Sequence, residues 1–390
     1  MWYNRLSEYL LKEGYVNNSI CPCVFIKKSN SGFAIVAVYV DDMNLIGNTD
    51  ELAKTAEYLK KEFEMKDLGK TRYCLGLQLE HLDSGILVHQ SAYTEKILKR
   101  FGMDTAHSLS TPMVVRSLDT LKDPFRPRQD DESILGPEVP YLSAIGALLY
   151  LAQCTRPDIA FAVSVLARYS SAPTLRHWKG VKDILRYLRG TTDMGLFYAN
   201  NSVDNPTIIG YADAGYLSDP HRGRSQTGYV FTCGDTAISW RSSKQTLVAT
   251  STNHSEIIVL YEAGKECFWL RSMIRHIRST CDLPSVTDNP TIIFEDNAAC
   301  IAQIKEGYIK GDNTKHIAPK FFHTHELQKN QETIVKQIRS NENLADLFTK
   351  SLPKCTFKTL VGKIGLKRLS KLSSNATKDQ GENFNQGEHQ

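Results

Sequence analysis

The sequence predicts a multidomain protein of mixed α+β and α/β class. Its 390 residues are enough for two or three domains of ordinary size. Strand and helix signals alternate over the first hundred residues, helical segments follow at 141–190, and a new series of strands and helices begins near 206. We therefore expect domains at 1–105, 106–205 and 206–354, followed by a C-terminal tail at 355–390.

The first domain is predicted from four segments. The apolar run FAIVAVYV (33–40) indicates a short buried strand, and DELAKTAEYLKKEF (50–63) has the periodicity of an amphipathic helix. TRYCLGLQLEHL and GILVHQ flank the turn residues Asp83-Ser84-Gly85, which favours a strand pair. SAYTEKILKRFGM (91–103) opens with a serine and is expected to form a helix.

Beyond residue 105 the predicted secondary structure changes twice, from a loop to helices and then to alternating strands and helices. Residues 106–140 are polar and rich in proline, which indicates an exposed loop, and three helices are expected over 141–190, separated by Pro157 and Pro173. From 206 the expected order is three strands, a helix, a strand, a helix, a strand and a short helix. The sequence after 370 has almost no apolar residues and is expected to be disordered.

Composition excludes several classes of protein. The hydrophobic fraction of 41% and the charged fraction of 23% are ordinary for a soluble globular protein. No apolar run reaches the roughly 18 residues of a membrane helix, so no membrane partner is expected. The nine cysteines are scattered without zinc-ligand spacing, which indicates reduced thiols in an intracellular protein. The net charge of +4 permits a nucleic-acid partner.

Four acidic residues stand at the boundaries of different predicted elements. Asp213 lies at the far end of the apolar run TIIGYADA (207–214), Asp296 comes shortly after TIIF, Glu256 opens a helical segment, and Asp346 lies in LADLFTK. A two-metal site needs oxygen ligands that converge from several elements and hold two ions roughly 4 Å apart. Magnesium prefers such carboxylate oxygens and keeps waters for a substrate phosphate.

Each acidic residue also has a purely structural interpretation. Asp213 could end a strand by turn chemistry, and Asp296 could cap the following helix. Asn253 and Glu256 have the spacing of a capping box, in which the acid only reaches back to a backbone amide. Asp346 could be an exposed acid in the first turns of a helix that begins in NENLADLFTKSL.

A family resemblance joins these residues. The motifs YADAG, QTGYVF, ISWRSSKQ, STNHSE, EDNAA, TKHI and LADLFTKSLP resemble, in this order, the ribonuclease H domain of copia-type LTR-retrotransposon polyproteins. The resemblance implies a mixed five-stranded α/β domain in which Asp213, Glu256, Asp296 and Asp346 bind two Mg2+ ions. It also implies magnesium-dependent endonucleolytic cleavage of RNA within RNA–DNA hybrids.

Further roles are implied more loosely. Contacts to the hybrid are expected from five residues near the motifs: Ser239, Trp240, Lys244, Gln245 and Asn297. His316 could assist product release, although a surface or packing histidine is the preferred interpretation, and His323 and His325 are expected to form a pair on the solvent side.

The upstream half resembles the same polyproteins. VAVYVDDMNLIG resembles the YxDD turn of reverse transcriptases, which would place Asp41 and Asp42 at a polymerase metal site. The following segments resemble the palm end, thumb and connection regions, so the resemblance runs from Met1 to about Pro353. A third catalytic Asp on an earlier palm strand is missing from the 38 residues before Tyr39. We therefore expect a truncated palm that has lost RNA-directed DNA polymerase activity.

Two alternatives remain open at this point. The chain could be a catalytically dead, nucleic-acid-binding remnant of a decayed transposon. Another polyprotein segment could instead supply the missing part of the polymerase in trans.

Overall fold

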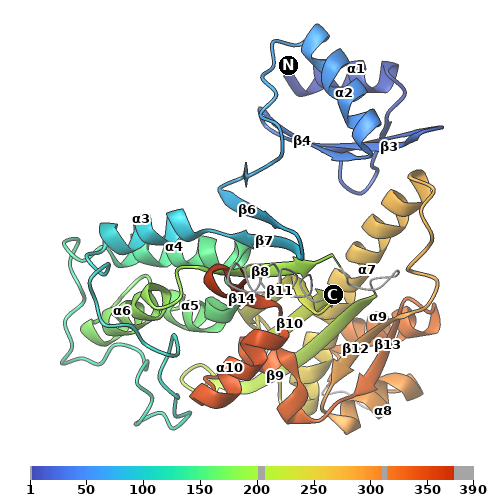
Figure 1. The fold of residues 1–390 in the computed structure, drawn as a ribbon. Helices are drawn as coiled ribbons and strands as arrows, with labels where there is room; N and C mark the ends of the chain where they lie inside the picture. Colours follow the sequence, from blue (N-terminus) through green and yellow to red (C-terminus); the bar gives the residue numbers. More distant parts are fainter. Residues whose placement is uncertain (1, 201–206, 310–313, 373–390) are drawn as a thin grey trace, which may run out of the picture. The chain divides into compact units, whose positions relative to one another are not determined.

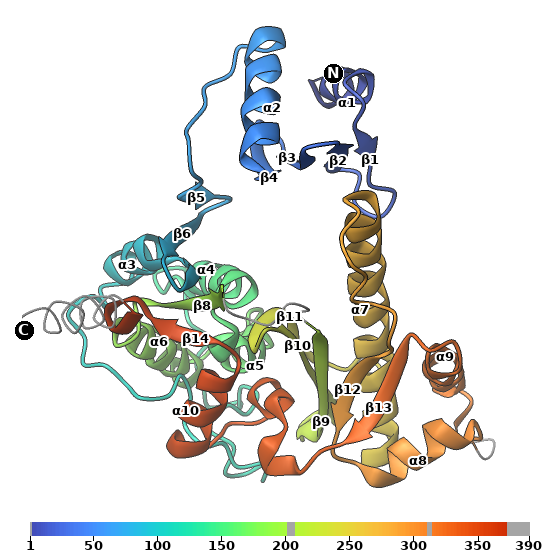
Figure 2. The same cartoon turned by 45° about the vertical axis from the view of Figure 1, so that its right-hand side comes forward.

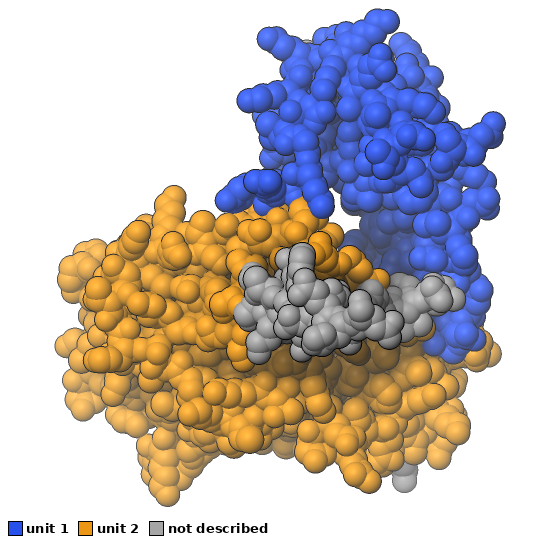
Figure 3. Space-filling model, in the orientation of Figure 1, with its two compact units in different colours: residues 1–75, 265–290 blue, residues 76–264, 291–390 orange. Residues whose placement is uncertain are grey.

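The computed structural model describes residues 2–200, 207–309 and 314–372, so the predicted disorder at the end of the tail lies outside the described residues (Figure 1). Contacts within the chain define two compact units, coloured separately in Figure 3. Unit 1 comprises residues 1–75 and 265–290, and unit 2 comprises residues 76–264 and 291–390. The domain boundaries expected from the sequence stay a prediction.

Unit 1 contains an antiparallel sheet with the strand order β1-β2-β3-β4. These strands are β1 (Val16–Asn17), β2 (Val24–Ser29), β3 (Gly32–Tyr39) and β4 (Asp42–Gly47), accompanied by α1 (Trp2–Lys12), α2 (Thr49–Glu62) and the short β5 (Tyr73–Cys74). Phe25 and Val36 pack with Leu10 and Leu59 of the two helices, whereas Ile26 and Ile35 pack with Cys281. Because successive side chains in a strand alternate between faces, the continuous apolar run in β3 can serve both clusters.

Unit 2 begins with a strand pair and a group of helices. The elements are β6 (Leu77–Leu82), β7 (Gly85–His89), α3 (Ser91–Arg100), α4 (Tyr141–Cys154), the 3-10 helix η1 (Pro157–Ile159), α5 (Ala160–Ala167), α6 (Leu175–Arg189) and β8 (Met194–Ala199). The predicted strand pair, the loop predicted at 106–140 and the three predicted helices are confirmed, and the observed loop spans residues 101–140. Helix α5 is buried almost all round, which explains its uniformly apolar sequence.

The second half of unit 2 holds a mixed five-stranded sheet with the order β11-β10-β9-β12-β13 (Figures 1 and 2). Strands β9 (Ile208–Asp219), β10 (Arg224–Cys233) and β11 (Thr236–Lys244) are antiparallel neighbours, whereas β12 (Thr291–Glu295) runs parallel to both β9 and β13 (Thr333–Gln337). This is the mixed sheet expected for a ribonuclease H-like domain. The β10–β11 turn at Gly234 and Asp235 has positive φ at both residues, as a tight hairpin turn requires.

The remaining elements are α7 (Thr252–Thr280), α8 (Ala298–Glu306), α9 (Ala318–Lys329), the 3-10 helices η3 (Ser340–Glu342) and η4 (Leu344–Phe348), α10 (Lys354–Lys363) and β14 (Leu366–Arg368). Helix α7 contributes residues to both units. Helices α8 and α9 contact each other and β13 (Figure 2). Strand β14 pairs with β8, in a second sheet that contains the order β14-β8-β7-β6.

Three details of the predicted order are wrong. Two helices, not one, lie between β12 and β13. Strand β9 continues to Asp219, so Asp213 lies inside the strand rather than at its end. The segment around Asp346 forms the short η4, and the next α-helix starts only at Lys354. Asn343 caps η4, and Pro353 occupies the position directly before α10.

One hydrophobic core runs through unit 2. It joins Leu148, Val165 and Leu185 of the helices α4–α6 to Val230 of β10 and Phe348 of η4. The helical region and the mixed sheet therefore share part of their buried apolar surface, and this shared burial stabilises both. In the described residues no helix is long and apolar enough to cross a membrane.

Candidate metal centre

Three of the four predicted carboxylates meet in unit 2. Asp213, Glu256 and Asp296 each present one oxygen, and these oxygens lie within 4.8 Å of one another. They come from β9, the start of α7 and the turn after β12. Asp213 and Glu256 are buried, and Asp296 is half-buried. Convergence from three elements is the arrangement that a divalent cation requires.

Strand register explains why Asp213 and Asp296 coincide. Tyr211 of β9 is paired with Phe294 of the parallel β12. Asp213 stands two residues further along β9, and Asp296 stands two residues further along the chain, directly after the end of β12, so the register brings the two acids to the same end of the strand pair. Glu256 belongs to the second turn of α7, and Asn253 donates to Gln303 Oε1 at 2.7 Å rather than capping the helix. The capping-box interpretation of Glu256 is therefore wrong.

Asp346 reaches the site through a lysine. Lys350 Nζ lies 2.6 Å from Asp346 Oδ1 and 3.2 Å from Asp213 Oδ1. The Thr349 hydroxyl donates to Asp213 Oδ2. Asp346 is buried, so the interpretation as an exposed helical acid is wrong.

The segment that carries Asp346 is held close against the sheet. Asn343 Nδ2 donates to the Ala212 carbonyl at 2.8 Å, and Ser242 Oγ donates to the Phe348 carbonyl at 2.6 Å. Gly228 of β10 stands opposite Asp213, and a Cβ at this position would lie 2.5 Å from Thr349 Cγ2. The absence of a side chain at Gly228 therefore permits this approach.

Burial dominates the electrostatics of the site. Desolvation raises the pKa of Asp213, and it raises that of Glu256 well above its usual value, with further contributions from Glu295 and Asp213. Burial, together with the charge of Asp213, raises the pKa of Asp346 to about 6. For Lys350, burial alone would lower the pKa, but Asp213 and Asp346 outweigh it and raise the pKa. The carboxylates therefore disfavour one another's ionisation, and the Lys350 ammonium offsets part of this repulsion.

Among the described residues, two buried carboxylate oxygens near this site accept no hydrogen bond. They are Glu256 Oε2 and Glu295 Oε2. A buried carboxylate oxygen without a partner is costly unless a cation binds it or the group is protonated. Burial first, and then the charge of Asp213, raises the pKa of Glu295 well above normal. The donor set of hard carboxylate oxygens fits Mg2+ or Mn2+.

Comparison with known proteins gives the family. Residues 1–115 match the family model described as reverse transcriptase (RNA-dependent DNA polymerase). The chain is 36% identical over 368 residues to the retrovirus-related Pol polyprotein from transposon TNT 1-94 of Nicotiana tabacum, with 93% of this chain and 27% of that protein covered. It is 30% identical over 366 residues to the corresponding polyprotein from transposon RE2 of Arabidopsis thaliana, with 94% and 24% covered. The chain belongs to the Pol polyproteins of copia-type retrotransposons.

The chain spans about a quarter of the length of these Pol relatives. Among solved structures, LC11-RNase H1, isolated from compost, is 19% identical, with 37% of this chain and 93% of that chain covered and a TM-score of 0.28. That likeness is too weak to assign a role to any residue of this Pol chain.

The residues expected to contact a hybrid have protein partners in this Pol chain. Trp240 Nε1 donates to the Ala152 carbonyl at 2.7 Å, and Gln245 Nε2 donates to the Ser255 carbonyl at 3.0 Å. Asn297 caps α8 by accepting from the Cys300 amide, so Asn297 rather than Asp296 is the cap. Lys244 Nζ lies 3.8 Å from Asp219, and Ser239 lines a cavity of about 300 Å³ beside Trp240. Their contact with nucleic acid stays a prediction.

The three histidines considered from the sequence make different contacts. His323 packs edge-on against Tyr261 at 5.1 Å, and His325 Nδ1 contacts the Ile304 carbonyl at 2.8 Å. Both are half-buried, so the predicted pair on the solvent side is wrong. Alternate residues of a helix do not face each other, which is why they make separate contacts. The His316 ring lies 6.4 Å from that of His254, and its role in product release stays a prediction.

The YVDD hairpin forms as predicted. Tyr39 of β3 pairs with Asp42 of β4, and Val40 with Asp41 makes the turn. Asp41 and Asp42 are exposed, and within residues 2–200, 207–309 and 314–372 they do not belong to a group of three potential metal ligands.

Sequence reasoning missed Glu295, Thr349 and Lys350. Glu295 directly precedes Asp296, and because neighbouring residues of a strand normally face opposite sides, only Asp296 was expected at the site. Lys350 stands four residues after Asp346, a spacing at which opposite charges pair on helical backbone. That spacing was the available signal.

Proposed function

We propose that this chain cleaves the RNA strand of RNA–DNA hybrids at a divalent-metal centre built from Asp213, Glu256, Asp296 and Asp346. The observation that carries the proposal is the convergence of three carboxylates, two of them buried, with the unpartnered Glu256 Oε2 among them. A purely structural cluster of this kind would be strongly repulsive, since like charges in a buried site disfavour ionisation.

The metal would be held by carboxylate oxygens from rigid elements. Two Mg2+ ions, when bound, would activate a water for in-line attack on the phosphodiester and stabilise the leaving 3′ oxygen. Asp213 is fixed by Thr349, and Asp346 by Lys350, before any ligand arrives. The buried position of Asp213 and Glu256 excludes bulk water from the site and strengthens every charge interaction there.

Selection of RNA would come from its 2′-hydroxyl, the group that distinguishes the two strands. Lys244 and Ser239 of β11 are proposed to contact the hybrid, because both keep part of their surface in solvent. The nine free cysteines support an intracellular setting, where thiols stay reduced.

The direct test uses the full chain and a hybrid labelled on the RNA strand. Magnesium-dependent cutting of the RNA strand only, lost in chelator, is expected for the wild type. Asp296→Asn should reduce cutting below detection, because it removes one ligand charge, whereas Asp288→Asn, an exposed acid before β12, should leave the rate unchanged. A folded wild type that leaves the hybrid intact would instead identify a catalytically dead remnant.

Nucleotidyl transfer is a second candidate function. The YVDD hairpin and the reverse transcriptase family match favour it. Since Asp41 and Asp42 meet no third ligand in the described residues, we propose that this site needs a carboxylate from a further polyprotein segment. Primer extension with and without a co-expressed upstream segment tests this, and no extension in either case would count against it.

A further inference from the structure

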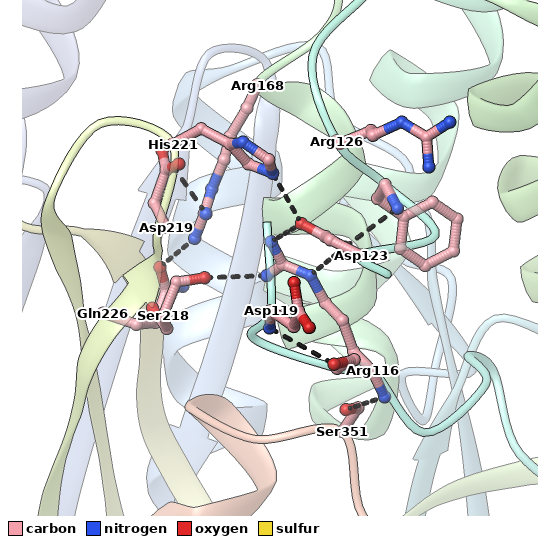
Figure 4. A network of polar contacts seen from close by, with 12 residues as sticks. Arg116, Asp119, Asp123, Arg126, Arg168, Ser218, Asp219, His221, Gln226 and Ser351 are labelled. Atoms are coloured by element: carbon pink, nitrogen blue, oxygen red, sulfur yellow. Dashed lines mark hydrogen bonds and ion pairs between the residues drawn. The ribbon is translucent and has the colours of Figure 1, made fainter. Parts of the chain in front are cut away.

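A buried polar network links the loop at 101–140 to the two segments that carry Asp213 and Asp346 (Figure 4). Its centre is the pair Arg116–Asp123, whose side chains are 2% and 0% exposed. Arg116 Nε donates to Asp123 Oδ1 at 2.8 Å, and a terminal nitrogen donates to Oδ2 at 2.6 Å. This two-bond geometry fixes the plane of the guanidinium.

The same arginine contacts both ligand-bearing segments. Its second terminal nitrogen donates to the Ser218 carbonyl at 2.8 Å, in β9 beyond Asp213. Its backbone amide donates to Ser351 Oγ at 2.7 Å, directly after Lys350. Figure 4 shows Arg116 between these two residues. One residue of a distant loop thus connects Ser218, in the strand that carries Asp213, with Ser351, which follows the segment that carries Asp346.

The β9 segment needs this support. Its pairing with β10 shifts register between Arg224 and Gln226, and Leu217 has φ of 51°, a conformation that is unfavourable for a branched residue. A bulge leaves backbone groups without ladder partners, so the Ser218 carbonyl depends on Arg116.

A second route runs from Arg168, directly after α5, to η4. Arg168 donates to Gln226 Oε1 at 2.6 Å, and Gln226 Nε2 donates to Ser242 Oγ at 2.9 Å. Ser242 then donates to the Phe348 carbonyl. His221 Nε2 lies 3.1 Å from Asp123 Oδ2, which closes the network around the β9–β10 turn.

We propose that Arg116 is a positioning residue of the metal centre, which sets the separation of Asp213 and Asp346 through Ser218 and Ser351. The proposal rests on the proposed function. Groups that contact metal ligands directly are worth about 10–100-fold in metal affinity. Arg116 acts one step further out, through Ser218 and Ser351, so we expect an effect at the lower end of that range. A loop that contributes no ligand thereby controls the geometry of the site.

The chain offers a matched control for a merely structural role. Arg156–Asp158 is a second buried pair, also 2% and 0% exposed, whose arginine bonds Thr191 rather than either ligand-bearing segment. Loss of either arginine leaves a buried carboxylate without its guanidinium partner and destabilises the fold. Only loss of Arg116 should also change the response to metal.

The experiment compares Arg116→Gln, Arg116→Lys and Arg156→Gln in the full chain. Two quantities are measured: the Mg2+ concentration for half-maximal RNA cleavage, and the rise in Tm caused by Mn2+. Arg116→Gln should raise the Mg2+ midpoint about ten-fold and reduce the Mn2+ effect on Tm, whereas Arg156→Gln should lower Tm without shifting the midpoint. Arg116→Lys keeps the charge but loses the planar fork, so it should fold and still shift the midpoint.

The outcomes separate the two proposals. If both glutamine variants lower Tm and neither changes the response to metal, Arg116 is only a structural residue. If the wild type does not cleave hybrids but gains Mn2+-dependent stability that Arg116→Gln and Arg116→Lys lose, the nuclease proposal fails and the positioning role stands. An unchanged midpoint in a folded Arg116→Lys variant overturns the positioning role.

Discussion

Adding one methyl group at Gly228 should displace the Asp346 segment. A Cβ there would lie 2.5 Å from Thr349 Cγ2, 2.9 Å from Phe348 Cβ and 3.1 Å from the Ala345 carbonyl oxygen. Carbon atoms pack at about 3.5–4.0 Å, so η4 must move away from β10 by about 1 Å in Gly228→Ala. Rotation of Thr349 alone cannot relieve the clash, since Phe348 Cβ is close to its backbone.

The displacement has two measurable consequences. Overpacking of this kind costs about 1–3 kcal/mol of unfolding free energy. A misplacement of about 1 Å at a reacting centre costs on the order of 10²-fold in rate. Denaturant unfolding and cleavage of the labelled hybrid, both on the full chain, measure the two effects separately.

Gly146→Ala is the matched control. Gly146 lies within α4, and nothing stands within 4 Å of the position its Cβ would take. Alanine is the better helix former by about 1 kcal/mol, so this variant should be slightly more stable and fully active. A Gly228→Ala protein with wild-type stability and rate would refute the close packing of η4 on the sheet.

Three further predictions concern the metal centre and its surroundings. Lys350→Met should lower the Tm measured in chelator and should increase the rise in Tm that Mn2+ causes, because the ammonium and the metal compete for Asp213 and Asp346. An equal rise in Tm with Mn2+ in the wild type and the variant would contradict this. Asn343→Ala should lower the unfolding free energy by about 1–3 kcal/mol, since it leaves the buried Ala212 carbonyl without its donor, and unchanged denaturant midpoints would exclude that contact. Burial lowers the pKa of His177 to about 4 from its usual 6.5. Between these two pH values the unfolded chain is protonated at His177, whereas the folded protein is not. Stability should therefore fall by about 3 kcal/mol as pH drops from 6.5 through 4, and His177→Gln should flatten that part of the curve; identical pH profiles would contradict the assignment.

The neutral state of His177 has a clear structural origin. Its Nδ1 accepts the Thr174 amide at 3.0 Å, and its Nε2 lies 3.0 Å from the Arg126 carbonyl, which only an N–H can satisfy. A proton on Nδ1 would remove the cap of α6. This prediction involves no residue of the metal centre, so it tests the fold independently.

Periodicity and turn residues were enough to predict most elements, whereas the four carboxylates were predicted from their positions in the motifs and from the family resemblance. Parallel pairing of β9 with β12, which the order of the elements along the chain does not determine, brings Asp213 to Asp296. The shape of η4 could not be predicted, because the contacts of Asn343 with Ala212 of β9 and of the Phe348 carbonyl with Ser242 of β11 override local helix signals. Arg116 was invisible for the same reason, since its partners Ser218 and Ser351 lie more than a hundred residues away.

The shared core of unit 2 has a consequence for recombination between related retrotransposons. Val230 and Phe348 bury their side chains with Leu148 and Leu185, and β14 closes a sheet begun far upstream by β6. A crossover near residue 205 between two diverged retrotransposons would join a helical region and a mixed sheet whose apolar surfaces had never been selected together. Productive recombinants should therefore inherit residues 76–372 from one parent, so that this span is transmitted as a single hereditary block.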